Sequence, residues 1–138
     1  MGNCCKCSRF LRCYRLFKDE NYVEQYTIHL KRYSLRRLVA ALRCGALDIK
    51  VNSGRRSKIP YNQRLCTFCS LGVIENEFHF TLVCPSLQDI RLKYISPFYV
   101  EQPDINKFNS LVTSSSNKIC KNLALFIHHA FKLRYKNN

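Results

Sequence analysis

The sequence predicts a small, mostly α-helical domain with a turn or hairpin insert near its middle. The chain has 138 residues, of which 46% are hydrophobic, enough for a modest core in a single domain. Apolar side chains recur at three- and four-residue steps over residues 23–42 and 119–133, as on the buried face of a helix. Closely spaced cysteines interrupt this helical pattern between the two stretches, which favours a tight turn there.

The first helix is expected to run from about Asn21 to Gly45, because glycine is typical just after the last helical turn. At about 100° per residue, Arg32, Arg36 and Arg43 fall within about 40° of one another. We expect them to form a basic stripe opposite the apolar face. An ordinary solvated helix face has the same composition, so both interpretations stay open at this point.

Residues 46–58 are expected to form a short extended segment and a loop. Polar and apolar residues alternate over residues 48–51, which is typical of a strand. Residues 52–54 read Asn-Ser-Gly, which is typical of a turn. A cluster of three basic residues follows this turn: Arg55, Arg56 and Lys58.

Three further helices are expected towards the C-terminus. Ser86 opens a capping-box pattern, which predicts a helix up to about Ile95. Asp104 is expected to cap a short helix, and a serine-rich loop then leads into the last helix. On that last helix we expect His128 and His129 to be a partly exposed pair rather than metal ligands.

One constellation carries recognisable chemistry: Cys66, Cys69, His79 and Cys84 follow the spacing C-x2-C-x9-H-x4-C. Two cysteines three residues apart can bind one ion from a single turn, with Zn–S bonds of about 2.3 Å. On an unbroken helix His79 and Cys84 would diverge by about 140°, but the proline after Cys84 frees that residue from helical geometry. Three thiolates and one imidazole make a closed set, which predicts a structural zinc ion rather than a hydrolytic one.

The expected fold class is therefore mostly α, a small helical domain with a zinc-bound turn or hairpin insert. An alternative remains, in which Cys69 and Cys84 are buried small hydrophobic residues and His79 lies at the surface. The expected segments are a Cys-rich basic lead-in that we expect to be disordered, a basic amphipathic helix with a Gly-Arg turn, the zinc-binding unit and the C-terminal helices: 1–18, 19–58, 59–95 and 96–138.

The charge of the chain suggests a polyanionic partner. Lys and Arg number 23 against 9 Asp and Glu, a net charge of +14, and residues 1–58 hold +10 of it. RNA or DNA is the first candidate, with contacts mainly to its backbone phosphates and with stacking on Tyr33 and Tyr61. The expected contact residues are basic side chains upstream of the zinc unit: Arg32, Arg36, Arg37, Arg43, Arg55, Arg56 and Lys58.

The first residues leave a second class of function open. Gly2 is a candidate for myristoylation, and Cys4 and Cys5 are candidates for palmitoylation, which together with the nearby basic residues would anchor the chain to a membrane. Lys6 stands where the acylation pattern has serine or threonine, which leaves a disordered, reduced Cys-rich lead-in and a second metal site as alternatives. The sequence shows no secretory signal and no membrane-spanning run, so we expect an intracellular protein of the nucleus or cytoplasm, membrane-associated only if acylated.

The zinc motif resembles the zinc-binding tail that follows the reverse transcriptase domain of non-LTR retrotransposons. The resemblance rests on a Cys-x-x-Cys pair, an acidic patch before a His-aromatic step and a Cys-Pro step: residues 64–69, 74–80 and 83–85. It extends over about residues 35–134, including a C-terminal helix that ends in Phe-Lys-Leu-Arg. It implies the same four zinc ligands, nucleic-acid binding and a reverse transcriptase core acting in trans as a partner.

The sequence shows no paired aspartates of the kind that hold the two metal ions of a polymerase, and no phosphate-cradling glycine loop. We therefore expect no enzyme, since the catalytic domain of the resembled reverse transcriptase is absent. The leading interpretation is a zinc-binding, nucleic-acid-binding module. The alternatives are an acylated, membrane-associated adaptor and a non-functional remnant of a mobile element.

Overall fold

The computed structural model describes residues 24–137, and this part of the chain is mostly helical, which confirms the predicted fold class. No extended strand is present in residues 24–137, where a single antiparallel bridge joins Leu65 and Ile74. The α-helices are, in chain order, α2 (Gln25–His29), α3 (Tyr33–Cys44), α4 (Lys50–Arg56), α5 (Gln88–Tyr94), α6 (Pro97–Val100), α7 (Ile105–Val112) and α8 (Asn117–Lys136).

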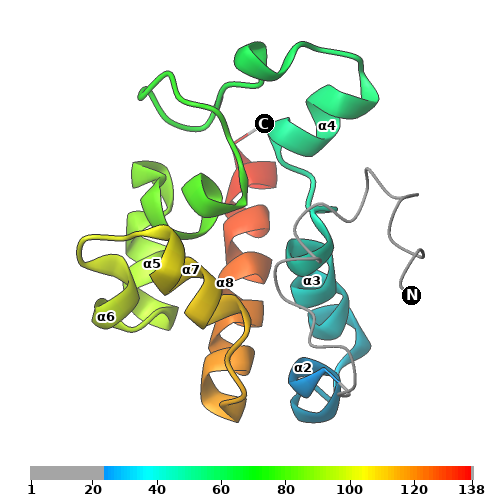
Figure 1. The fold of residues 1–138 in the computed structure, drawn as a ribbon, viewed down its shortest axis with the longest axis vertical. Coiled ribbons are helices and arrows are strands. Elements are labelled where there is room, and N and C mark those ends of the chain that lie inside the picture. The colour runs from blue at the N-terminus through cyan, green and yellow to red at the C-terminus, as the bar shows by residue number, and fades with distance from the viewer. Residues whose placement is uncertain (1–23, 138) are drawn as a thin grey trace, which may run out of the picture.

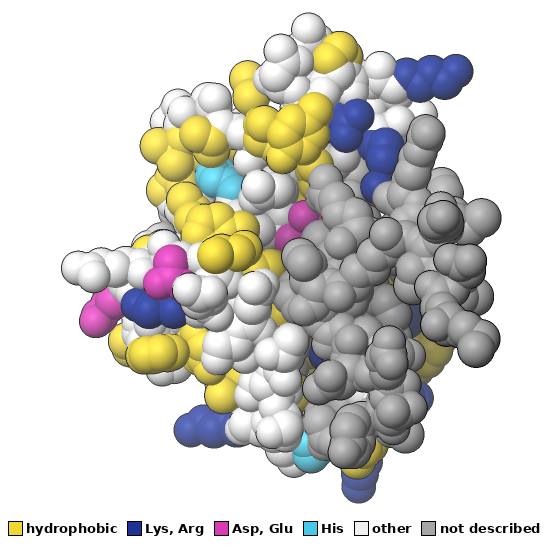
Figure 2. Space-filling model, viewed as in Figure 1, with side chains coloured by type: hydrophobic (Ala, Val, Ile, Leu, Met, Phe, Trp, Pro, Cys, Tyr) yellow, Lys and Arg dark blue, Asp and Glu magenta, His cyan; other side chains and the backbone are white. Residues whose placement is uncertain are grey.

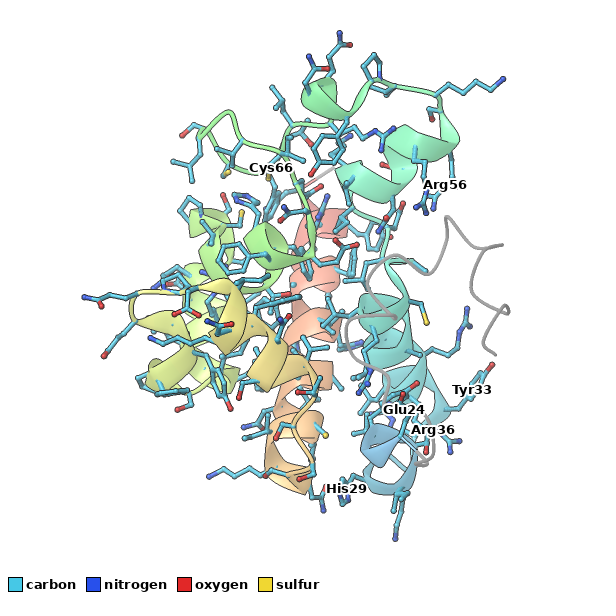
Figure 3. The ribbon with its side chains drawn as sticks, in the orientation of Figure 1. Glu24, His29, Tyr33, Arg36, Arg56 and Cys66 are labelled. Carbon is cyan, nitrogen blue, oxygen red and sulfur yellow. The ribbon has the colours of Figure 1, made fainter. Side chains whose placement is uncertain are left out.

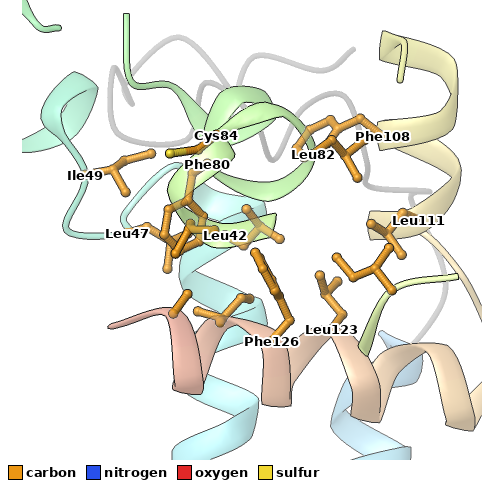
Figure 4. Close-up of a cluster of buried hydrophobic side chains, with 14 of the residues drawn as sticks. Leu42, Leu47, Ile49, Phe80, Leu82, Cys84, Phe108, Leu111, Leu123 and Phe126 are labelled. Carbon is orange, nitrogen blue, oxygen red and sulfur yellow. The ribbon is translucent and has the colours of Figure 1, made fainter. Parts of the chain in front are cut away.

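The last helix, α8, organises the molecule. It packs against α2 and α3 on one side and against α5 and α7 on the other, and α4 and the cysteine-bearing loops cover one end (Figure 1). Residues far apart in sequence meet in one core around it, which includes Leu42, Phe80 and Phe126 (Figure 4). The core therefore draws on α3, on the cysteine-bearing segment and on the C-terminal helices together.

The predicted first helix is wrong in one respect, because it is broken. Helix α2 ends at His29, Leu30 is extended (φ −95°, ψ 98°), and α3 begins at Tyr33. Tertiary contacts account for the break: Leu30 is buried in a small cluster with Leu35 of α3, and the His29 ring lies 2.9 Å from the Ser115 carbonyl oxygen.

The predicted end of this helix, at Gly45, is confirmed. Gly45 has a left-handed backbone (φ 65°, ψ 40°), which glycine adopts without steric cost. The next residue, Ala46, donates its amide to the Ala41 carbonyl oxygen at 2.8 Å, so the last turn of α3 is closed by hydrogen bonds.

The prediction of an extended segment and loop over residues 46–58 is wrong, because α4 forms there. The first turn of α4 is held from outside the helix: the amide of Val51 donates to the Glu75 carbonyl oxygen at 3.0 Å, and the amide of Lys50 donates to the Glu75 carboxylate at 2.7 Å. Val51 and Asn52, which are adjacent in the chain, are both buried, and this breaks the alternation of buried and exposed side chains expected of a strand.

Of the helix caps predicted further along the chain, some are confirmed and one is wrong. Asp104 caps α7 as predicted, accepting a hydrogen bond from the Lys107 amide at 2.8 Å, and Ser116 caps α8. The prediction that Ser86 caps a helix is wrong, because its hydroxyl donates to the Phe68 carbonyl oxygen instead. Ser86 thereby ties the start of α5 to the cysteine-bearing loop.

Candidate metal centre

Cys66, Cys69, His79 and Cys84 converge at one end of α8, and together they could hold a metal ion. Their candidate ligand atoms all lie within 4.8 Å of one another, and all but Cys69 are buried. The Sγ atom of Cys69 lies 3.5 Å from Nε2 of His79. Two ligands of a tetrahedral zinc ion with bonds of 2.0 to 2.3 Å are about 3.6 to 3.8 Å apart, so the four atoms need only small movements to bind one ion.

The first two ligands lie on a short loop closed by main-chain hydrogen bonds. The Cys66 amide donates to the Val73 carbonyl oxygen at 2.8 Å, and the Glu75 amide donates to the Arg64 carbonyl oxygen at 3.0 Å. Gly72 has a positive φ of 64° and open space around its Cα, so the turn needs glycine for its backbone and not for lack of room. The expected hairpin insert is therefore present in a reduced form, with one bridge and no extended strand.

The other two ligands are brought together by a turn of π-helix at His79–Val83. The Cys84 amide donates to the His79 carbonyl oxygen at 2.7 Å, which is the i to i+5 bond that defines this geometry. This bond brings His79 and Cys84 close together, whereas residues five apart on an α-helix point in different directions. His79 is 3% exposed, so the alternative with a surface histidine is wrong.

Glu75 contacts the candidate site, and the sequence did not predict this role. Its carboxylate is 1% exposed and lies 3.7 Å from the Cys66 sulfur. Arg134, near the end of α8, pairs with it at 2.6 Å, and the Lys50 amide donates to its other oxygen at 2.7 Å. This one carboxylate therefore joins a candidate ligand, the start of α4 and the end of α8.

Arg91 supports the site from the side of α5. Its guanidinium is fully buried and donates to the carbonyl oxygens of Cys84 and Thr81, each at 2.8 Å, and to the Gln88 side chain at 2.7 Å. Burial lowers the pKa of Arg91 to about 10, so the group stays charged at neutral pH. It fixes the backbone around Cys84 and places a positive charge beside a candidate thiolate.

The protein environment favours the neutral forms of the ligands. Burial, with a contribution from the Glu75 carboxylate, raises the pKa of Cys66 to about 12, and burial also raises the pKa of Cys84. Burial lowers the pKa of His79, which keeps its imidazole neutral and able to bind a cation. A metal ion must therefore displace thiol protons, as it does at structural sites of this kind.

The predicted nucleic-acid contacts divide into exposed and buried residues. Arg32, Arg37, Arg56 and Lys58 are exposed, and Arg36 and Arg55 are half-buried. Figure 3 places Tyr33 and Arg36 of α3 on the same side of the molecule as Arg56 of α4.

Arg43 is the exception and corrects the predicted stripe. It is 5% exposed, pairs with Glu24 at 2.8 Å and donates to the Val112 carbonyl oxygen at 3.3 Å. Helical spacing put Arg43 on the arginine side of α3, but α2 and α7 cover its position. Arg43 is therefore part of the interior and not of the exposed basic surface.

The acylation candidates Gly2, Cys4 and Cys5 lie outside the described residues. Among residues 24–137, no helix has the length and apolar character needed to cross a membrane.

Comparisons with protein-family models, with curated proteins and with solved structures found no match to this chain.

Proposed function

We propose that the chain is a zinc-binding module that binds nucleic acid through a basic face, and that it serves as the tail of a reverse transcriptase. The basic face consists of the predicted contact residues that are at least partly exposed: Arg32, Arg36, Arg37, Arg55, Arg56 and Lys58. The observation that carries this proposal is the largely buried cluster of Cys66, Cys69, His79 and Cys84. The module has no catalytic role of its own in this proposal, and a polymerase core is its partner in trans.

Zinc is the metal that this donor set favours. Three thiols and an imidazole suit zinc, whereas magnesium and calcium prefer oxygen ligands. All four positions of a tetrahedral ion are filled by protein atoms, so the ion would hold the loops together and leave no position for a reacting water. Co²⁺ titration tests the donor set: we expect thiolate-to-cobalt absorption, and its loss in Cys69→Ser but not in Cys44→Ser, which changes a cysteine outside the cluster.

The basic face is the second support for the proposal. The buried acids and arginines balance, since Glu75 and Glu77 match Arg43 and Arg91. The net charge of +11 on residues 24–137 therefore lies on residues that are at least partly exposed. Figure 2 shows Lys and Arg side chains grouped on the side of α4.

Aromatic side chains accompany these cations. Tyr33 on α3 is 68% exposed, and the Arg37 guanidinium lies over its ring at 5.8 Å. Tyr61 is also exposed, and the Arg64 guanidinium lies over it at the same distance. Arginine with an exposed ring is the combination by which proteins hold the phosphates and stack the bases of single-stranded nucleic acid.

A binding titration tests the nucleic-acid proposal. We expect the zinc-loaded chain to bind structured RNA or single-stranded DNA, with an affinity that falls steeply as salt rises. Arg32→Gln with Arg37→Gln should weaken binding, and Lys118→Gln with Lys121→Gln, two exposed lysines of α8, is the matched control. No binding by the wild-type chain at low salt would refute the proposal.

A further inference from the structure

A second group of cations surrounds a cavity of about 270 Å³ between α5 and α8. Lys93 of α5 and Lys132 and Lys136 of α8 line it together with His129, and its other lining residues are uncharged. Among the described residues that line this cavity there is no aspartate or glutamate. The cavity is separate from the candidate metal centre and from the arginines of α3 and α4.

The spacing of the basic residues along α5 and α8 places their side chains at the cavity. His129, Lys132 and Lys136 are three and four residues apart, so they share one face of α8. The Tyr94 and His129 rings stack across the two helices, with centroids 5.3 Å apart and an angle of 7° between the ring planes. Lys93 Nζ lies 5.4 Å from the centroid of the Tyr94 ring, which keeps this cation at the cavity as well.

The described residues that line the cavity include no acid to compensate these lysines. Like charges four residues apart, such as Lys132 and Lys136, disfavour a helix slightly. Among the described residues, the ion pairs Arg43–Glu24, Arg56–Asp48 and Arg134–Glu75 do not include these three lysines. An anion bound in the cavity would offset the repulsion among them.

We propose that this cavity binds a phosphate group of a nucleic-acid backbone, so that the contact surface extends from α3 across α8 to α5. This inference rests on the proposed function. His128 and His129 link the two areas: their ring centroids are 5.1 Å apart, and His128 lines a neighbouring cavity together with Arg37 of α3. Each cavity therefore contributes one histidine to this pair, with Arg37 lining the first cavity and Lys93 lining the second.

His129 reports on the occupant of the cavity. Its partial burial and the positive charges of His128, Lys93 and Lys132 lower the pKa of His129. The other ionisable side chains that line the cavity are Tyr94 and Lys136. A phosphate held against these cations raises the pKa of His129 towards its ordinary value, and NMR of the imidazole measures this change.

The first experiment compares two double variants of the full, zinc-loaded chain. Lys132→Gln with Lys136→Gln removes two cations from the cavity, and Lys118→Gln with Lys121→Gln removes two exposed lysines from the other end of α8. For single-stranded RNA we expect the first variant to bind roughly three- to tenfold more weakly and to lose about 1.4 from the slope of log affinity against log salt. Equal affinities and slopes for the two variants, with RNA bound by the wild type, would overturn the inference and leave the proposed function standing.

The second experiment uses pyrophosphate alone, so its result does not depend on RNA binding. We expect pyrophosphate to raise the pKa of His129 in the wild type and in the Lys118/Lys121 control, but not in the variant without Lys132 and Lys136. If the wild type binds no RNA while this response is present, the proposed function fails and the phosphate site stands. If the pKa of His129 is unchanged by pyrophosphate, the cavity does not hold phosphate.

Discussion

Arg134 and Glu75 form a buried ion pair between the end of α8 and the metal-binding loop. The Arg134 Nη1 atom lies 2.6 Å from Glu75 Oε1, and Nη2 lies 3.3 Å from Oε2. The guanidinium is also surrounded by the rings of Phe68, Phe80 and Phe131, each about 6 Å from it. The C-terminal helix is thus fastened to the segment that carries Cys66.

Removing one member of this pair should destabilise the protein. Arg134→Met keeps most of the apolar stem but leaves the Glu75 carboxylate buried without its cation, so we expect a loss of about 3 kcal/mol in the free energy of unfolding. Arg56→Met is the control, because the Arg56–Asp48 pair is exposed and should contribute less than about 1 kcal/mol. Urea unfolding monitored by circular dichroism measures both. Equal effects of the two changes would contradict a structural role for the buried pair.

The cysteines should separate into ligands and packing residues. In the zinc-loaded protein, Cys66→Ser should lower the unfolding midpoint markedly and remove the effect of a chelator, because the ion links loop and π-helix. Cys44→Ser lies outside the cluster and should leave chelator sensitivity intact. Thermal unfolding with and without chelator provides the comparison. A chelator effect that survives Cys66→Ser would exclude this cysteine as a ligand.

Gly54 should prefer glycine although it lies inside a helix. A methyl group at its Cα would come within 2.6 Å of Arg64 Cγ. The Arg64 side chain cannot easily move away, because its guanidinium donates hydrogen bonds to the Val51 and Ile59 carbonyl oxygens. We expect Gly54→Ala to destabilise the protein by about 1 kcal/mol or more, against a helix-propensity gain of similar size.

The same change should stabilise the protein once Arg64 is shortened. In an Arg64→Ala background the clash disappears, so Gly54→Ala should raise the free energy of unfolding by up to about 1 kcal/mol. This double-mutant cycle is measured by urea unfolding. A change of the same sign in both backgrounds would show that Arg64 is not what requires glycine here.

Arg43 and Arg32 should behave differently although both were predicted to contact nucleic acid. Arg43→Met should lower the free energy of unfolding by about 3 kcal/mol, because it leaves the largely buried Glu24 carboxylate without its cation. The same change should leave the salt dependence of RNA binding unchanged. Arg32→Gln should do the reverse: little effect on stability and a shallower salt slope. A salt slope that changes equally in both variants would contradict the assignment of Arg43 to the interior.

The helical class and the four-residue cluster could be predicted because both depend on local spacing. Apolar periodicity marks α8, and the steps from Cys66 to Cys69 and from His79 to Cys84 bring ligands together within single turns. Asp104 is likewise a local signal, since a cap bonds only its own first turn.

Features that depend on tertiary contacts could not be predicted. Helix α4 forms where the sequence reads as a strand and turn, because Glu75, about 25 residues away, holds its first turn. The pattern on α3 could not show that α2 and α7 bury Arg43. The pairing of Glu75 with Arg134 spans 59 residues, and no spacing rule connects the two.

Native mass spectrometry can show whether Cys66, Cys69, His79 and Cys84 hold one structural zinc ion. We predict one zinc ion per chain in protein purified without chelator, its absence in a Cys69→Ser variant, and loss of the folded charge-state distribution when the metal is removed. A wild-type chain that carries no zinc after supplementation, and that keeps its folded distribution in the presence of a chelator, would contradict it.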